Sequence, residues 1–132
     1  MAQLNHLGIF TAHPRRLLNF YTRVLGFTSG QKAMLPREIV YAIFAIRREC
    51  VMVKLLKDAV CLEIFWFKDY TLKPKVKGMS AGYNHFGMEI EGRDAFCYRL
   101  SREFKIDVTK IKRGGHYNYF IRDPDKNIIE IK

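Results

Sequence analysis

A short motif occurs twice in this chain of 132 residues, once in each half. Segment 4–9 reads LNHLGI and segment 83–88 reads YNHFGM, so the pattern Asn-His-x-Gly places His85 79 residues after His6. A second pair follows in the same order, because Glu63 within LEI recurs 67 residues later as Glu130 within IEI. Self-similarity of this kind indicates an internal repeat. The chain is therefore expected to contain two copies of one module.

The segments between the repeated motifs predict the elements of the second module. Residues 93–105 carry apolar side chains at roughly helical spacing and predict a helix. Short apolar segments separated by Gly and Pro turns predict three strands, at 106–112, 116–122 and 128–132. With the strand around His85, this half is expected to read strand, helix, three strands.

In the first half, a helix and a final hairpin correspond to those of the second half. A proline at the start, a glycine at the end and apolar residues at helical spacing predict an amphipathic helix from Pro14 to Gly26. Segments 50–56 and 60–67 predict a hairpin. The two repeat offsets differ by 12 residues, which predicts an insert near 36–47. Its apolar spacing favours a helix, with a strand as the alternative.

Composition narrows the class of protein. With 48% hydrophobic residues, the chain has enough apolar material for one compact domain, 1–132, in which the modules span 1–78 and 79–132. No apolar run approaches the roughly 18 to 20 residues of a membrane-spanning helix, and no signal peptide is recognised. The three cysteines lack CxxC spacing, which argues against a disulfide scaffold and favours a cytoplasmic location.

The net charge of +10 raises the question of polyanion binding. The excess is spread along the chain, with +4 in residues 1–34, +4 in 35–78 and +2 in 79–132. The densest basic segment, 73–78, has no aromatic residues between its lysines and is interpreted as a solvated connection. This distribution argues against nucleic-acid binding, and an anionic small-molecule substrate accounts for the charge equally well.

Strand geometry places the repeated His and Glu residues on faces that can line a cleft. Alternate residues of a strand point to opposite faces. His6 then shares a face with Phe10, and His85 shares one with Gly87. Glu63 shares its face with three further residues, Cys61, Phe65 and Phe67. The opposite faces are wholly apolar, so the helix of each module is expected to cover them.

A glutamate inside an apolar strand is costly to bury unless it is paired, hydrogen-bonded or bound to a metal. Two imidazoles and two carboxylates can satisfy each other through a divalent cation and leave coordination positions for water or substrate. We therefore predict a metal site formed by His6, Glu63, His85 and Glu130. Taken singly, a strand histidine is usually structural and a strand glutamate can face solvent, but recurrence in register favours ligands.

Other reactive residues are interpreted as structural. His13 before Pro14 and His116 beside a glycine turn are expected at the surface. Cys61 has no base at a fixed spacing and is interpreted as a packing residue rather than a nucleophile. Segment 112–115, KRGG, is read as a solvated hairpin turn, with a mobile cationic loop as the alternative.

These residues together resemble the vicinal oxygen chelate superfamily, which includes glyoxalases, bleomycin-resistance proteins and extradiol dioxygenases. The resemblance rests on His6 in LNHLGI, on LLNFYTRVLGF at 17–27, on Glu63, on His85 and on DPDKNIIEI at 123–131. It implies an α+β fold of two βαβββ modules, whose curled mixed sheets surround a metal cleft. The His/Glu/His/Glu order is most similar to the glyoxalase I branch.

The resemblance also implies a chemistry. A divalent nickel, cobalt or zinc ion would polarise a substrate carbonyl, Glu130 would remove the adjacent proton, and the metal would stabilise the resulting enediolate. Glu63 would be the more constant ligand, or the two glutamates would exchange roles. A homodimer is implied, in which His6 and Glu63 of one chain face His85 and Glu130 of the other, with a site inside one chain as the alternative.

Two positions depart from the glutathione-using members. These place Arg four residues after the first His and Asn four residues after the first Glu, where this chain has Phe10 and Phe67. With Cys61 and Phe65 they predict an apolar, aromatic substrate pocket, so the small-molecule substrate is expected not to be based on glutathione. The alternatives are a metal-free drug-binding protein of the bleomycin-resistance type and a dioxygenase, which the fourth ligand argues against.

Overall fold

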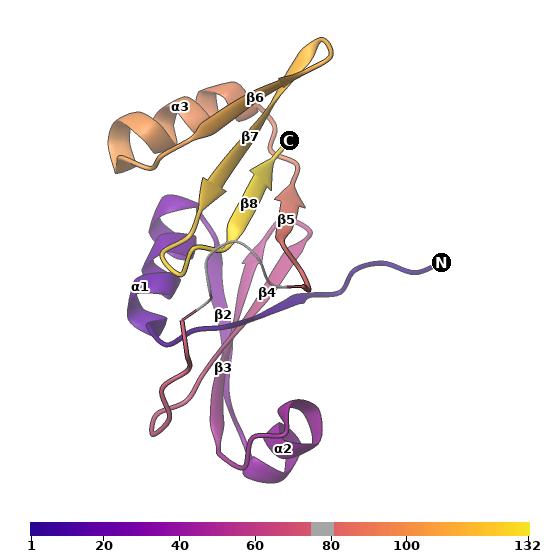
Figure 1. Ribbon diagram of the computed structural model, residues 1–132, viewed down its shortest axis with the longest axis vertical. Helices are drawn as coiled ribbons and strands as arrows, with labels where there is room; N and C mark the ends of the chain where they lie inside the picture. Colours follow the sequence, from indigo (N-terminus) through magenta and orange to yellow (C-terminus); the bar gives the residue numbers. More distant parts are fainter. Residues whose placement is uncertain (75–80) are drawn as a thin grey trace. The chain divides into compact units, whose positions relative to one another are not determined.

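The computed structural model describes residues 1–74 and 81–132, and the chain divides into two compact units after Pro74 (Figure 1). The first unit has seven elements: β1 (Leu7–Phe10), α1 (Pro14–Asn19), the π-helix η1 (Phe20–Val24), β2 (Thr28–Leu35), α2 (Arg37–Phe44), β3 (Cys50–Lys57) and β4 (Val60–Trp66). The second has five: β5 (His85–Met88), α3 (Arg93–Phe104), β6 (Thr109–Arg113), β7 (His116–Arg122) and β8 (Ile128–Ile131).

Each unit contains one four-stranded mixed sheet, and the two sheets have the same topology. The strand orders are β1-β4-β3-β2 and β5-β8-β7-β6. In each sheet the strand that comes first in the sequence pairs in parallel with the strand that comes last, β1 with β4 and β5 with β8. The other neighbouring strands are antiparallel. Neither sheet closes on itself, because each order begins and ends with an edge strand. The predicted α+β fold of two βαβββ modules is confirmed.

The apolar faces lie in the core, as the alternation of the strands predicts. Leu62 and Ile64 on β4 are fully buried, and α1 packs close to this strand. Ile129 and Ile131 on β8 are also fully buried. In the second unit, α3 lies on the face that carries Tyr119, whose hydroxyl donates a hydrogen bond to a carboxylate oxygen of Asp94 at the start of the helix.

The helix predicted between Pro14 and Gly26 is present, but its second half is wound more loosely. It begins as α1 with Pro14 in its first turn and continues as η1. Gly26 then adopts a φ of +80°, a backbone conformation that favours glycine and ends the helix.

The insert folds as the helix α2, which confirms the helical interpretation of residues 36–47. Its Val40 is fully buried in a small core with Cys50, Phe65 and Phe67. Those phenylalanines belong to the face of β4 that carries Glu63, because alternate residues share a face. The insert thus covers one end of a face that the strand pattern alone leaves open to a cleft.

Strand β2 was not assigned from the sequence. Its residues TSGQKAML show no apolar alternation, and most of them are exposed. The strand lies at the edge of its sheet, and its register with β3 shifts between Ser29 and Lys32. An edge strand with an irregular register buries little side-chain surface, so it leaves no strong pattern in the sequence.

Two further expectations concern the rest of the chain. Within the described ranges, no helix has the length and apolar character needed to cross a membrane. The basic segment 73–78 falls mostly outside the described residues, which resume at 81.

Candidate metal centre

The first unit brings His6 and Glu63 together. Strand β1 runs parallel to β4 with Gly8 opposite Glu63, and His6 immediately precedes β1. The imidazole Nε2 lies 3.4 Å from Glu63 Oε2. The carboxylate is largely buried, with 13% of its side chain exposed, whereas 44% of the His6 side chain is exposed. The carboxylate is therefore much less accessible to solvent than the ring that contacts it.

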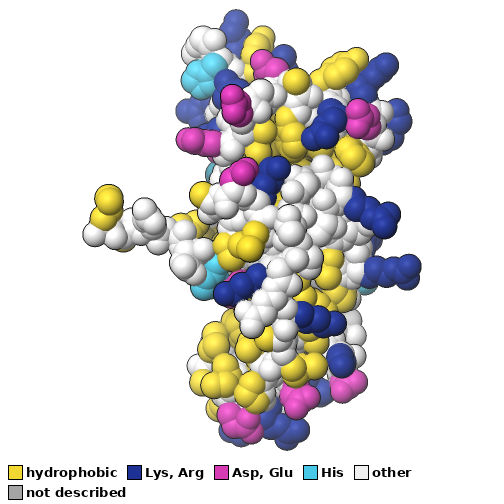
Figure 2. Space-filling model, turned by 180° about the vertical axis from the view of Figure 1, so that it is seen from behind, with side chains coloured by type: hydrophobic (Ala, Val, Ile, Leu, Met, Phe, Trp, Pro, Cys, Tyr) yellow, Lys and Arg dark blue, Asp and Glu magenta, His cyan; other side chains and the backbone are white. Residues whose placement is uncertain are grey.

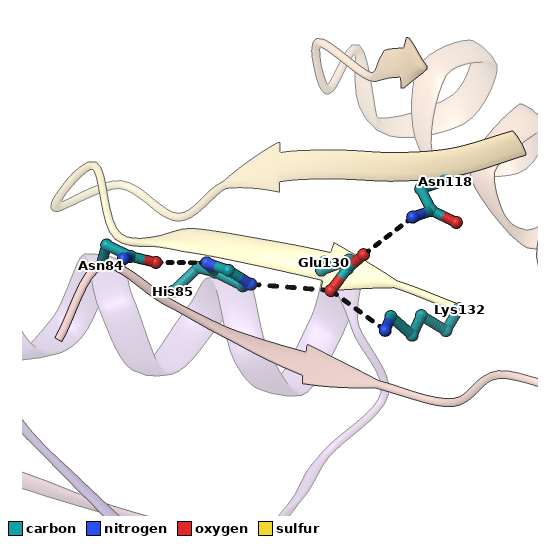
Figure 3. Close-up of polar contacts among 5 residues, drawn as sticks. All are labelled: Asn84, His85, Asn118, Glu130 and Lys132. Carbon is teal, nitrogen blue, oxygen red and sulfur yellow. Dashed lines mark hydrogen bonds and ion pairs between the residues drawn. The ribbon is translucent and has the colours of Figure 1, made fainter. Parts of the chain in front are cut away.

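The second unit repeats this arrangement. Strand β5 runs parallel to β8 with Gly87 opposite Glu130, and His85 is the first residue of β5. Nε2 of His85 contacts Glu130 Oε2 (Figure 3), at a distance of 3.6 Å. The exposed fractions of the two side chains, 40% and 11%, are close to those of the first pair. Each unit thus forms one His–Glu pair, and the repeat in the sequence is also a repeat in side-chain geometry.

The asparagine of each Asn-His dipeptide holds the other nitrogen of the ring. Oδ1 of Asn5 lies 2.9 Å from Nδ1 of His6, and Asn84 contacts Nδ1 of His85 in the same way (Figure 3). When Nδ1–H donates to the amide oxygen, the neutral ring directs the lone pair of Nε2 toward the glutamate. Hydrogen bonding of the second ring nitrogen in this manner is typical of metal-binding histidines.

Each glutamate also faces a lysine, which the sequence did not indicate. Lys54 on β3 is the cross-strand partner of Glu63, and its Nζ lies 3.5 Å from Oε1. Lys132, two residues after Glu130, places Nζ 3.6 Å from Oε2 (Figure 3). Both lysines are substantially exposed, and such pairs stabilise a fold only weakly. Each carboxylate therefore has a positive neighbour that can move into solvent.

Asn118 adds a further contact to the second pair. Its Nδ2 donates a hydrogen bond to Glu130 Oε1 at 3.1 Å, and the residue is buried on β7. One oxygen of this carboxylate is thus held by an amide, while the other faces His85 and Lys132. Glu63 has no such hydrogen bond among the described residues, so the two carboxylates are not equivalent.

The spacing within each pair fits two ligands of one ion. Two ligand atoms about 2.1 Å from a metal, at angles of roughly 90° to 110°, lie about 3.0 to 3.4 Å apart. The observed separations of 3.4 and 3.6 Å are within a few tenths of an ångström of that range. In the part of the chain that the structure describes, no three His, Cys, Asp or Glu residues gather as a complete site. Each unit brings together two candidate ligands.

The four predicted substrate-binding residues occupy different environments. Phe65 and Phe67 are each only 8% exposed and belong to the core under α2. Phe10 is 38% exposed, and its ring lies 4.7 Å from that of Phe44 and 5.9 Å from that of Phe67. Cys61 is partly exposed. Phe44 of α2 therefore packs against two residues of the expected pocket wall, Phe10 and Phe65, and Phe10 and Cys61 are the members that keep some exposure.

The remaining reactive groups lie where little chemistry is expected. His13 and His116 are exposed, and Gly114 forms the β6–β7 turn with a φ of +60°. Burial raises the pKa of Cys50 to about 11, and burial together with Asp94 does the same for Cys97. Both thiols therefore stay protonated near neutral pH. The hydrogen bond to Asp94, followed by burial, raises the pKa of Tyr119 to about 12.

A comparison with protein families gives a match over nearly the whole chain. The family model described as the Glyoxalase/Bleomycin resistance protein/Dioxygenase superfamily matches residues 3–131. The chain belongs to this superfamily. The resemblance inferred from the repeated His and Glu motifs is thereby confirmed. No curated protein matches the sequence of this superfamily member.

Several solved structures share the fold of this chain. A glyoxalase family protein from Bacillus cereus is 11% identical, with a TM-score of 0.78 over 99% of this chain and 93% of that one. The trypanothione-dependent glyoxalase I of Leishmania major is 19% identical, with a TM-score of 0.72 over 99% and 86%. TnmS3, an antibiotic binding protein from Streptomyces sp. CB03234, is 14% identical, with a TM-score of 0.69 over 100% and 95%. Identities this low support the fold alone.

Proposed function

We propose that this chain is a divalent-metal-dependent lyase or isomerase of the glyoxalase I type, acting on a small carbonyl substrate not based on glutathione. The observation that carries the proposal is the recurrence of Asn-His···Glu in both units, with the same atoms in contact and similar distances. A metal site would account for the recurrence of the His–Glu contact together with its asparagine. Metal binding gives a single explanation for the placement of the asparagine, histidine and glutamate in each unit, six residues in all.

The proposed ligand set is His6, Glu63, His85 and Glu130, meeting around one ion within a chain or across a homodimer. A bound divalent ion would supply Lewis-acid stabilisation of the charge that develops on a carbonyl oxygen. The histidines would bind through Nε2, since Nδ1 is engaged by Asn5 or Asn84. Nickel, cobalt and zinc all suit such mixed nitrogen and oxygen ligands.

Glu130 is the proposed base, and Asn118 would be its positioning residue. The proton next to the carbonyl would move to Glu130 Oε2, while Asn118 holds Oε1 in place. A carboxylate fixed at one oxygen keeps its orientation when the other oxygen changes partner. Glu63, which lacks this anchor among the described residues, would serve as the second carboxylate ligand.

The substrate class follows from Phe10 and the partly exposed Cys61. The positions that carry Arg and Asn in glutathione-using members are occupied here by Phe10 and Phe67. Phe10 offers an exposed aromatic surface, and Phe67 is buried. An apolar or aromatic carbonyl compound would bury surface against Phe10, whereas a charged tripeptide would lose two polar partners.

The test is a metal-dependent proton-transfer assay. Phenylglyoxal with a simple thiol is compared with methylglyoxal plus glutathione, and exchange of the substrate proton in D2O is followed by NMR. Turnover should require added nickel, cobalt or zinc, favour phenylglyoxal, and be lost in Glu130→Gln. The exposed Glu103→Gln is the matched control. Equal turnover by Glu130→Gln and wild type would contradict the proposal.

The lysines favour a second candidate, a metal-free protein that binds an aromatic small molecule. Lys54 and Lys132 already give each glutamate a positive partner without an ion. For such a protein the His–Glu pairs would be structural, and Phe10 would contact the aromatic small molecule. Metal analysis separates the two candidates, because only the first retains a divalent ion through purification without chelator.

A further inference from the structure

A second candidate binding site lies at the end of the first sheet, beside the start of α2. It is a pocket of about 260 Å³. Met34 at the end of β2 and Phe67 just after β4 form its apolar wall, and the segment before β3 closes another side. Figure 2 shows hydrophobic side chains beside mixed basic and acidic ones at the end of the first unit where α2 lies.

Basic residues dominate the charged wall of this pocket. Four basic side chains and two acidic ones line it, a net charge of +2, from Arg37, Arg47, Arg48 and Lys68 against Glu49 and Asp69. Within residues 1–74 and 81–132, none of the four cations forms an ion pair. Unpaired cations around a concave surface raise the local concentration of anions.

Two of the guanidinium groups are held in place without being neutralised. Arg47 stacks over the ring of Tyr41 at 4.0 Å, and Arg48 lies 5.3 Å from the ring of Tyr70. Nη1 of Arg48 also donates a hydrogen bond to the main-chain oxygen of Asp69 at 3.1 Å. Stacking leaves the edges of a guanidinium free to donate hydrogen bonds, and a fixed group loses less entropy when it binds.

We propose that this pocket binds an oxyanion, a phosphate or a carboxylate, carried on an apolar body. The guanidinium groups of Arg47 and Arg48 would bind the oxyanion, and Met34 and Phe67 would contact the apolar part. Planar guanidinium groups match the oxygens of both anions. Phe67 lies four residues beyond Glu63 on one extended segment, about 13 Å away, so the site is separate from the His–Glu pair and goes beyond the proposed function.

The proposal is tested by calorimetric titration at low ionic strength with inorganic phosphate and with phenyl phosphate. Phenyl phosphate should bind more tightly than phosphate because of the apolar wall. The variant Arg47→Gln/Arg48→Gln should weaken phenyl phosphate binding about tenfold or more, since it removes charge-assisted hydrogen bonds. Glu49→Gln should tighten it, because one repulsive carboxylate is lost.

The matched control removes the same charge elsewhere. Lys112→Gln/Arg113→Gln lies at the exposed β6–β7 hairpin and should bind phenyl phosphate as wild type does. Equal weakening in both double variants, unchanged binding in Arg47→Gln/Arg48→Gln, or no binding of phenyl phosphate to wild type would overturn the proposal. Zinc binding by every variant should equal that of wild type, so this outcome is independent of the metal centre.

Discussion

Replacing Asn5 and Asn84 with alanine tests whether the Asn-His dipeptides orient metal ligands. Each change removes the partner of a histidine Nδ1 and leaves the proposed His and Glu ligands in place. Without this partner the ring can rotate away from the glutamate. It can also carry its proton on Nε2, and a protonated Nε2 has no lone pair with which to bind a metal. Metal affinity should fall while the fold is kept, because both asparagines are exposed.

The expected loss of metal affinity is worked out from the one hydrogen bond that each ring loses. A hydrogen bond contributes about 1 kcal/mol net, and about 1.4 kcal/mol corresponds to a tenfold change in affinity. The rings of His6 and His85 are 44% and 40% exposed, so water can replace the lost partner. Each single variant should therefore bind about fivefold more weakly. Each asparagine contacts a different ring, so the sum of the two losses is about 2 kcal/mol, or roughly thirtyfold, and a departure from this sum would measure coupling through the shared ion.

The assay is competition for zinc between the protein and a fluorescent chelator of known affinity. Asn19→Ala, an exposed asparagine at the end of α1, is the control and should bind zinc as wild type does. Thermal unfolding of all variants checks the fold. A double variant within twofold of wild type, with its fold intact, would refute the proposed role of the asparagines.

Three further experiments test the lysine contacts, the burial of the cysteines and the packing of α2. Lys54→Met with Lys132→Met should tighten zinc binding severalfold in the same competition assay, because two exposed cations no longer compete for the carboxylates; weaker binding would contradict this. Iodoacetamide at pH 8 should label Cys61 alone in the native protein, since the two buried thiols have raised pKa values; mass spectrometry showing three fast labels would refute the burial pattern. Phe44→Ala should lower the free energy of unfolding by about 2 kcal/mol, measured in urea, because a half-buried ring leaves the aromatic cluster; an unchanged midpoint would show that α2 does not pack there.

The module order was predictable because it depends on local patterns and on the repeat. Strand alternation predicted which face of β4 carries the buried Leu62 and Ile64, and the 79-residue spacing predicted that His6 and His85 occupy equivalent positions. Parallel pairing of the first and last strand of each module then places each histidine beside its own glutamate. Each histidine lies beside its glutamate because the two strands are neighbours in the sheet, although the two residues are far apart in the sequence.

The residues around the pairs were not predictable in the same way. Lys54 reaches Glu63 because β3 and β4 pair in one particular register, which is set by the hairpin turn and not by a motif. Asn118 lies 12 residues from Glu130 and contacts it from the neighbouring strand β7. The asparagines before His6 and His85 did leave a signal, since they belong to the repeated motif, but their role required the hydrogen-bond geometry.

The position of α2 shows that an inserted helix can bury residues on a strand face that the sequence pattern predicts to line a cleft. Alternation correctly placed Phe65 and Phe67 on the face of Glu63, opposite the apolar face of β4. The pattern could not show that α2 packs over these rings, because packing between separated elements has no local sequence signature. The prediction of an aromatic pocket wall therefore remains a proposal, with Phe10 as its exposed member.

The most direct test of the metal centre is the stoichiometry of bound metal in chelator-stripped protein titrated with zinc. The two His–Glu pairs are proposed to share one ion, so one zinc per chain should bind, and His6→Ala or His85→Ala alone should remove it. A stoichiometry of two per chain, with each variant losing only one, would show that the pairs act separately. Wild-type protein that binds no zinc would contradict the metal centre altogether.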